Sequence, residues 1–177
     1  MAVVLPFSEP ELRLLGALLR NKVRFLVVGL SAAALQGAPV VTQDIDLWFE
    51  DLSDPKLAAA LRKIGAAYVP PFNLNPPMLA GPGTQPFDVV LRMDGLDDFR
   101  TEYRRAIEVR IGKLRLKVLP LSRIITSKQA ANRPKDRLVI PLLRDALAAQ
   151  SILPKHRTKQ RKSTMRSGAP VQNSRAR

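Results

Sequence analysis

The chain carries the sequence TQDIDLWF at residues 42–49, in which two aspartates alternate with apolar residues that favour a β-strand. In a strand, residues two apart leave the same face, about 6.5–7 Å apart along the backbone. Asp44 and Asp46 would therefore share one side, while Ile45 and Leu47 face a core. Two carboxylates placed in this way repel each other unless a cation lies between them. The pattern indicates either a Mg²⁺ site or an ordinary pair of solvated strand-edge residues.

A third carboxylate, Asp88, stands in the otherwise apolar run FDVVL at residues 87–91. Burying an unpaired carboxylate is unfavourable, so this side chain needs a partner or solvent. If its strand lies beside that of Asp44 and Asp46, three aspartates can hold one or two Mg²⁺ ions, with Asp88 acting on an attacking hydroxyl. The alternative is an aspartate at a strand end that accepts hydrogen bonds from the backbone.

Composition bounds the class of protein. The 177 residues are enough for a domain with a hydrophobic core, and 46% hydrophobic with 25% charged residues is typical of globular chains. The sequence has no cysteine, no apolar run near the roughly 20 residues of a membrane-spanning helix, and no secretory signal pattern at its start. We expect a cytoplasmic protein without disulfides or a membrane partner, with one domain at residues 1–153.

The formal net charge of +14 is unevenly distributed, because residues 155–177 hold eight Lys or Arg and no Asp or Glu. Residues 154–177 also hold almost no large apolar side chain, so we predict a disordered basic tail. Such a tail can attract RNA by neutralising phosphates. It can equally be a solubilising extension, and it has no aromatic residue on which bases could stack.

Capping residues and helix breakers divide the rest of the chain into short elements. We expect helices from Ser8 to Asn21 and at 31–35, 55–64, 96–105, 122–132 and 135–149, with Ser122 capping the fifth. Strands are expected at 24–28, 44–49, 67–69 and 87–92, with a hairpin at 106–118. The proline-rich segment 70–86 is predicted to be a loop, either a substrate lid or a variable connection. The fold class is therefore α/β.

The first strand runs into Gly29 and a short helix. A strand–glycine–helix turn points helix N-terminal amides outward, where they can bind an anion, so Gly29 and Ser31 lie near a phosphate-friendly turn. The aspartate pair follows about 15 residues later. A phosphate site beside a metal site is the arrangement used in phosphoryl-type transfer.

Four segments together resemble the nucleotidyltransferase superfamily, which has a polymerase-β-like fold. They are VVGLSAAALQG at 27–37, the DID triplet at 44–46, Asp88, and LSRIITSKQAANRPKD at 121–136. The last segment is similar to the helical end of a compact bacterial subgroup that includes toxin- and antitoxin-like proteins. The resemblance implies an α+β nucleotidyltransferase-like fold, with a short mixed β-sheet flanked by helices.

The resemblance also implies an activity, namely Mg²⁺-dependent transfer of a nucleoside monophosphate from an NTP such as ATP to a hydroxyl on RNA, a protein or a small molecule. Asp44, Asp46 and Asp88 would be the catalytic and metal-binding residues. Those expected to contact the nucleotide are Gly29, Ser31, Lys128 and Arg133, and Lys135 is a weaker candidate than Lys128. The three basic residues could instead be solvated or make capping contacts.

Three positions depart from the family pattern. Leu30 stands where the family has Gly or Ser, Gln36 stands where relatives often have His, and Val40 replaces an Arg. These changes favour a rival interpretation, in which a catalytically weak nucleotidyltransferase-fold protein binds nucleic acid or a cognate partner protein. Trp48 could stack on a base or simply pack in the core.

Overall fold

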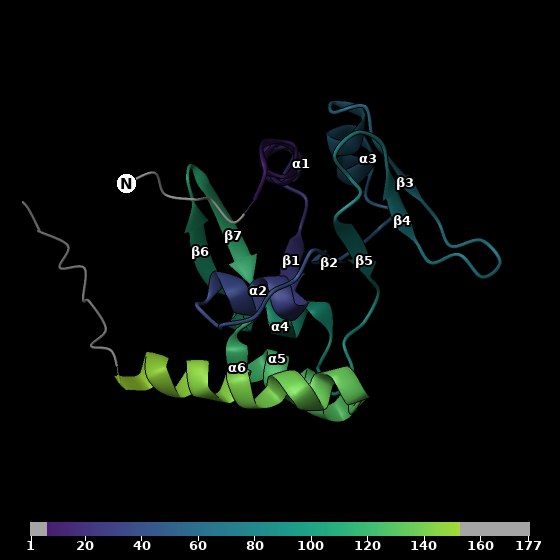
Figure 1. Ribbon diagram of the computed structural model, residues 1–177. Coiled ribbons are helices and arrows are strands. Elements are labelled where there is room, and N and C mark those ends of the chain that lie inside the picture. Colours follow the sequence, from purple (N-terminus) through teal and green to yellow (C-terminus); the bar gives the residue numbers. More distant parts are fainter. Residues whose placement is uncertain (1–6, 153–177) are drawn as a thin grey trace, which may run out of the picture.

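The computed structural model describes residues 7–152 and confirms the α/β fold (Figure 1). One mixed sheet has the strand order β3-β4-β5-β2-β1-β7-β6. Its strands are β1 (Phe25–Val28), β2 (Ile45–Phe49), β3 (Ala67–Val69), β4 (Met78–Ala80), β5 (Phe87–Val90), β6 (Ile107–Ile111) and β7 (Leu114–Val118). The expected basic tail and the domain boundary at residue 153 lie outside the described residues.

The helices follow from their caps. They are α1 (Glu9–Arg20), α2 (Gly29–Leu35), α3 (Pro55–Arg62), α4 (Phe99–Arg105), α5 (Leu121–Ala131) and α6 (Pro134–Ile152). A capping box opens α1, where the Ser8 amide donates to Glu11 at 2.8 Å. The expected cap of α5 was wrong, because the helix begins one residue earlier. Pro120 has the extended backbone (φ −59°, ψ 149°) of an N-cap, which places Ser122 inside the first turn.

Strand alternation gives the sheet two different faces. Asp46 and Trp48 point to one face, and Ile45, Leu47 and Phe49 point to the other. Helix α4 covers the first face, where Phe99 meets the Trp48 ring edge-on at 5.6 Å. Trp48 is buried, so the packing interpretation of this residue is confirmed. On the opposite face, the Leu114 side chain of β7 lies beside Gly16 of α1.

The segment 70–86 is not the uninterrupted loop that its prolines indicated. Residues 78–80 form β4, which pairs with both β3 and β5 in antiparallel fashion. A strand of three residues is too short to show the alternation that identifies strands in sequence. Strand β4 extends the sheet on the far side of Asp88, next to the candidate site.

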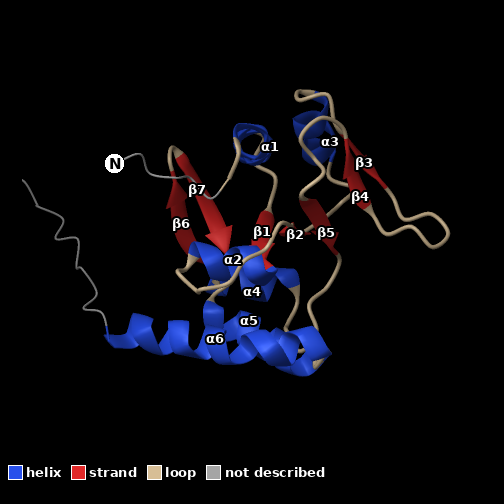
Figure 2. Ribbon diagram, viewed as in Figure 1, coloured by secondary structure: helices blue, strands red, loops and turns tan. Residues whose placement is uncertain are grey.

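Helices α4, α5 and α6 gather at one end of the sheet (Figure 2), and ion pairs with buried carboxylates join them. Glu102 of α4 is fully buried and accepts hydrogen bonds from Arg123 Nε of α5 at 3.0 Å and from Arg105 at 2.9 Å. Helix α5 ends at Asn132, whose left-handed backbone (φ 48°, ψ 31°) turns the chain into α6. In residues 7–152, none of the helices combines the length and the apolar character that crossing a bilayer needs.

Candidate active site

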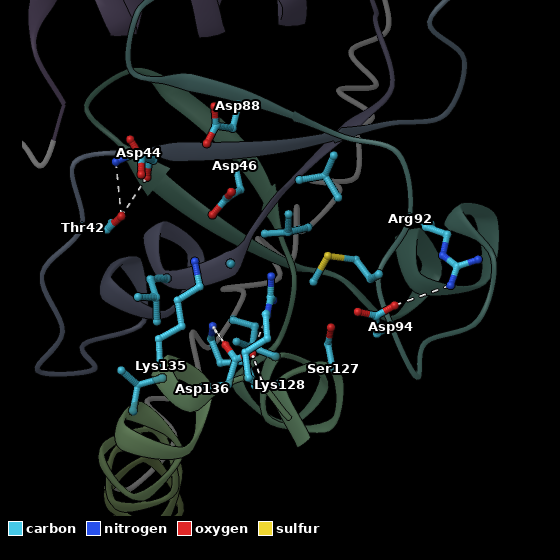
Figure 3. Close-up of a pocket in the computed structure, with 18 residues that line it drawn as sticks. Thr42, Asp44, Asp46, Asp88, Arg92, Asp94, Ser127, Lys128, Lys135 and Asp136 are labelled. Carbon is cyan, nitrogen blue, oxygen red and sulfur yellow. Dashed lines mark hydrogen bonds and ion pairs between the residues drawn. The ribbon is translucent and has the colours of Figure 1, made fainter. Parts of the chain in front are cut away.

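The sheet register brings the three aspartates together. Strand β2 lies between β1 and β5, and its parallel pairing with β5 sets Asp46 directly opposite Asp88. Asp44 immediately precedes β2 and has the same parity as Asp46. All three side chains line one cavity of about 360 Å³, and Figure 3 shows them around its rim. This volume lies within the range of small-ligand sites.

The glycine at the end of β1 is required by the carboxylate beside it. Gly29 has a φ of +65°, and a Cβ atom at this position would overlap Asp46 Oδ2. Only glycine therefore satisfies both the left-handed backbone and the close approach of the carboxylate. The glycine turn and Asp46 are therefore packed against each other.

The carboxylates crowd negative charge into the cavity. The pKa of Asp46 is raised to about 6, first by burial and then by repulsion from Asp88 and Asp44. The positive charges of Lys128 and Lys135 act in the opposite direction and lower this pKa, but they do not outweigh the other effects. A raised pKa of this kind, in a cleft, identifies a candidate functional group.

Two of the basic residues expected to bind phosphate are instead held by a carboxylate that the sequence analysis missed. Asp136, at the start of α6, is fully buried and accepts from Lys128 Nζ at 2.9 Å and from Arg133 Nε at 2.8 Å. Burial alone would raise the pKa of Asp136, but these two hydrogen bonds prevail and hold it below its usual value. The i, i+3 spacing of Arg133 and Asp136 was the available signal.

Lys135 is better placed than the sequence indicated. It is exposed, lines the same cavity, and forms no salt bridge within residues 7–152. Figure 3 shows its side chain extending from α6 toward the aspartates. Lys128 and Arg133 also line the cavity, but their charges are already paired with Asp136.

Ser31 lies apart from the aspartate cavity. Its buried hydroxyl donates to the Val28 carbonyl at 3.0 Å, so the group closes the first turn of α2. Leu30 instead lines the cavity beside Gly29. Ser31 lines a neighbouring hollow, which Val40 borders and which shares Thr42 and Asp44 with the aspartate cavity. The expected contact between Ser31 and phosphate stays a prediction, and it would compete with the hydrogen bond from the Ser31 hydroxyl to Val28.

Other residues at the site have supporting roles. Thr42 Oγ1 accepts from the Asp44 amide and donates to the Asp44 carbonyl, both at 3.2 Å, which fixes the backbone that presents Asp44. Gln36 joins α2 to α5, since its amide donates to Leu119 O and its carbonyl accepts from Leu121 N. Arg92 and Asp94, which form a 3.6 Å pair at the cavity wall, were also missed.

The donor set suits Mg²⁺, although the site is not a complete metal cage. Asp44, Asp46 and Asp88 line the same cavity, but among residues 7–152 no three metal-ligating side chains lie close enough to form a ready binding group. Mg²⁺ usually keeps several waters and takes one or two carboxylates together with substrate phosphates. The aspartates therefore suit a Mg²⁺ ion that binds together with a nucleotide, whose phosphates would complete its coordination.

Comparison with solved structures places this fold. The chain is similar to ANT(2'')-Ia in complex with adenylyl-2''-tobramycin, with a TM-score of 0.52 and 15% identity over 78% of this chain and 88% of that one. It is also similar to the solution structure of the antibiotic-resistance factor ANT(2'')-Ia, with a TM-score of 0.54 and 15% identity over 80% and 84%. The fold is of the nucleotidyltransferase type. No family model matches the chain, and no curated protein sequence does either.

At this level of identity the likeness concerns the nucleotidyltransferase-type fold alone. It confirms the expected α/β architecture, with helices around a mixed sheet. The expected membership of a toxin- and antitoxin-like subgroup stays a prediction, as do the roles of individual residues.

Proposed function

We propose that this chain is a Mg²⁺-dependent nucleotidyltransferase that moves a nucleoside monophosphate from an NTP to a hydroxyl acceptor. One observation carries the proposal. Three aspartates on or next to adjoining strands line one cavity against the Gly29 turn, and burial together with repulsion between the carboxylates raises the pKa of Asp46 to about 6. A site with uncompensated negative charge of this kind is suited to a divalent cation and the phosphates that accompany it.

The aspartates would share the chemistry. Asp44 and Asp46 would hold Mg²⁺, which when bound neutralises charge on the triphosphate and the leaving pyrophosphate. Asp88, opposite Asp46 on the next strand, would accept the proton of the acceptor hydroxyl. The acceptor oxygen then forms a bond to the α-phosphorus as the α–β bridging P–O bond breaks, and the electron pair of that bond leaves with pyrophosphate. Asp88 could alternatively serve as a third ligand.

The opposite wall of the cavity supplies positive charge. Lys135 is the cation best placed to contact phosphate, because its ammonium group is exposed and lines the cavity. Lys128 and Arg133 form salt bridges with Asp136, so we propose that they mainly hold α6 in position. Any contact that they make with the nucleotide would be secondary. The Gly29 backbone would lie against the phosphates.

One observation favours the rival function, a catalytically weak module that binds nucleic acid or a partner protein. Leu30 lines the cavity beside Gly29, and the Ser31 hydroxyl already donates a hydrogen bond to the Val28 carbonyl. A leucine there narrows the space for phosphates and offers no hydrogen bond. The rival function could involve a cognate partner protein or RNA bound through residues 154–177. A role in a toxin–antitoxin pair is compatible with either function.

Transfer of radiolabel from α-³²P-labelled NTPs, with ATP first, tests the proposal in the presence of Mg²⁺ and total cellular RNA, protein and small-molecule extracts. We expect the wild type to label an acceptor and Asp44→Asn and Asp88→Asn to lose that activity. Asp145→Asn, the same change at an exposed position of α6, is the matched control and should retain it. Equal labelling by all four proteins would reject the proposal. If calorimetry detects no Mg²⁺-dependent NTP binding, the rival function is favoured.

A further inference from the structure

The aspartate face of the sheet continues beyond the catalytic strands. The register sets Asp88 opposite Met78 on β4, and Met78 opposite Val69 on β3. Side chains that lie directly opposite each other on neighbouring strands share a face. Asp46, Asp88, Met78 and Val69 therefore form one row across the sheet.

The outer half of this row is apolar and open. Met78 is 49% exposed and Val69 is 39% exposed, whereas Leu79, which points to the opposite face, is buried. The connection between β3 and β4 adds Phe72 and Leu74, which are 72% and 100% exposed. The solvated face of an antiparallel sheet normally carries polar side chains. Val69 and Met78 lie directly opposite each other on neighbouring strands, and exposed apolar side chains gathered in this way indicate a binding surface.

The surface formed by Val69 and Met78, which we call the platform, carries no charge. Residues 64–87 contain no Asp, Glu, Lys, Arg or His, although a quarter of the whole chain is charged. Two strand spacings separate Val69 from Asp88, which is about 10 Å. A substrate group that extends from Asp88 along this row therefore meets only apolar side chains over a length close to that of an aromatic ring with a short linker.

We propose that the acceptor is a small, uncharged alcohol or phenol whose apolar body lies on the platform, with its hydroxyl at Asp88. This inference rests on the proposed nucleotidyltransferase function and names its acceptor class. A polycationic acceptor would need carboxylates along the platform, and a polyanion such as RNA would need Lys or Arg there. Neither residue type occurs in residues 64–87, so the platform selects for the absence of charge.

Four probes test this selection in one assay of label transfer from α-³²P-ATP with Mg²⁺. They are 2-phenylethanol and N-acetyl-L-tyrosinamide as uncharged acceptors, tobramycin as a polycation and oligouridylate as a polyanion. We expect kcat/KM for at least one uncharged probe to exceed that for tobramycin and for oligouridylate by tenfold or more. ATP affinity is measured separately by calorimetry.

Variants then locate the selection on the sheet. Met78→Gln and Val69→Thr should each raise the KM for the uncharged acceptor, by about tenfold at Met78, with ATP affinity unchanged. Ile107→Thr, at the opposite edge strand and with the same 39% exposure as Val69, is the control and should leave this KM unchanged.

The outcomes separate the two proposals. ATP binding together with equal or better transfer to tobramycin or oligouridylate would overturn the acceptor class alone. The same holds if ATP binds but no probe is labelled, or if the Met78 and Val69 variants keep the wild-type KM. Absence of both Mg²⁺-dependent ATP binding and transfer to any extract would overturn the proposed function, and the acceptor class with it.

Discussion

Two carboxylates line the same cavity in opposite electrostatic states. Asp136 is fully buried yet satisfied, because Lys128 and Arg133 each donate to it, and its pKa is held below the usual value. Asp46 is only partly buried, but its nearest charged neighbours include two further aspartates, and its pKa is raised to about 6. The negative charge of Asp136, which joins α5 to α6, is thus neutralised by two cations, whereas the negative charge of Asp46 on the sheet is not.

We interpret this difference as one between a carboxylate that stabilises the fold and one that serves the proposed function. A buried ion pair is a poor indicator of function, because removing either partner mainly destabilises the fold. A crowded set of carboxylates destabilises the fold by itself and is retained only where something else benefits, such as a bound cation. The same substitution should therefore have opposite effects on stability at the two positions.

The largest effect is expected at Asp136. Asp136→Asn leaves Lys128, whose side chain is 13% exposed, without its anionic partner. Breaking a buried pair in this way costs about 3–5 kcal/mol, and about 3 kcal/mol is expected here because the Arg133 side chain is 57% exposed. Urea denaturation followed by circular dichroism measures the change. A loss below about 1 kcal/mol would mean that Asp136 does not stabilise the fold in the way that this comparison requires.

The next effect is expected at Gly29. Gly29→Ala introduces a Cβ that overlaps Asp46 Oδ2 on a backbone with φ +65°. We expect a loss of about 2 kcal/mol in unfolding free energy from backbone strain and displacement of the carboxylate, together with loss of nucleotide binding. Gly37→Ala is the matched control, since it has a φ of +86° but open space around its Cβ.

The double variant Gly29→Ala, Asp46→Asn does not relieve this overlap, because Asn has the same shape as Asp. Gly29→Ala, Asp46→Ala does relieve it, and it should recover the part of the loss that comes from the clash. Additive losses in a double-mutant cycle would contradict the packing of Asp46 on the glycine turn.

The sequence was a good guide to the features that depend on local periodicity. Alternation within residues 42–49 put Asp44 and Asp46 on one face, and the apolar run around Asp88 identified its strand. The structure adds the register of β2 and β5, which sets Asp46 opposite Asp88. That register depends on contacts between segments about 40 residues apart in the chain, which no local pattern encodes.

Other features were beyond local patterns for identifiable reasons. Strand β4 has three residues between prolines 77 and 82, too few for an alternation to appear. The assignment of Lys128 to phosphate overlooked Asp136, because burial of a carboxylate at a helix start is a property of the packing of α6 on α5. Ser31 faces the Val28 carbonyl because α2 begins at Gly29, two residues earlier than expected.

A smaller effect is expected from pH at Asp46. Its folded pKa of about 6 lies above the usual aspartate value of 3.8, so ionisation of this group opposes folding at neutral pH and the penalty disappears as pH falls through 6 toward 4. Asp46→Asn should therefore be more stable than the wild type at pH 7, by about 1–2 kcal/mol after screening. That difference should shrink at pH 5. Urea titrations of both proteins at the two pH values measure it.

Asp136 gives the opposite sign in the same experiment. Its folded pKa is lowered, so its stabilisation is complete above the usual aspartate range and is lost only as pH falls below that range. The Asp136→Asn deficit should consequently be the same at pH 7 and pH 5. A difference for Asp46→Asn that stays constant over this interval would mean that Asp46 is not electrostatically strained.

The smallest effect is expected at Lys135, and it tests which cation serves the cavity. Lys135→Met removes an exposed charge that has no salt bridge in residues 7–152, so unfolding free energy should change by less than about 0.5 kcal/mol. Mg²⁺–ATP affinity should nevertheless fall about fivefold, and the deficit should narrow at high salt as screening weakens the phosphate contact. Arg137→Met, at an exposed position of the same helix outside the cavity lining, is the control. Unchanged affinity in Lys135→Met would return the phosphate contact to Lys128 despite its pairing with Asp136.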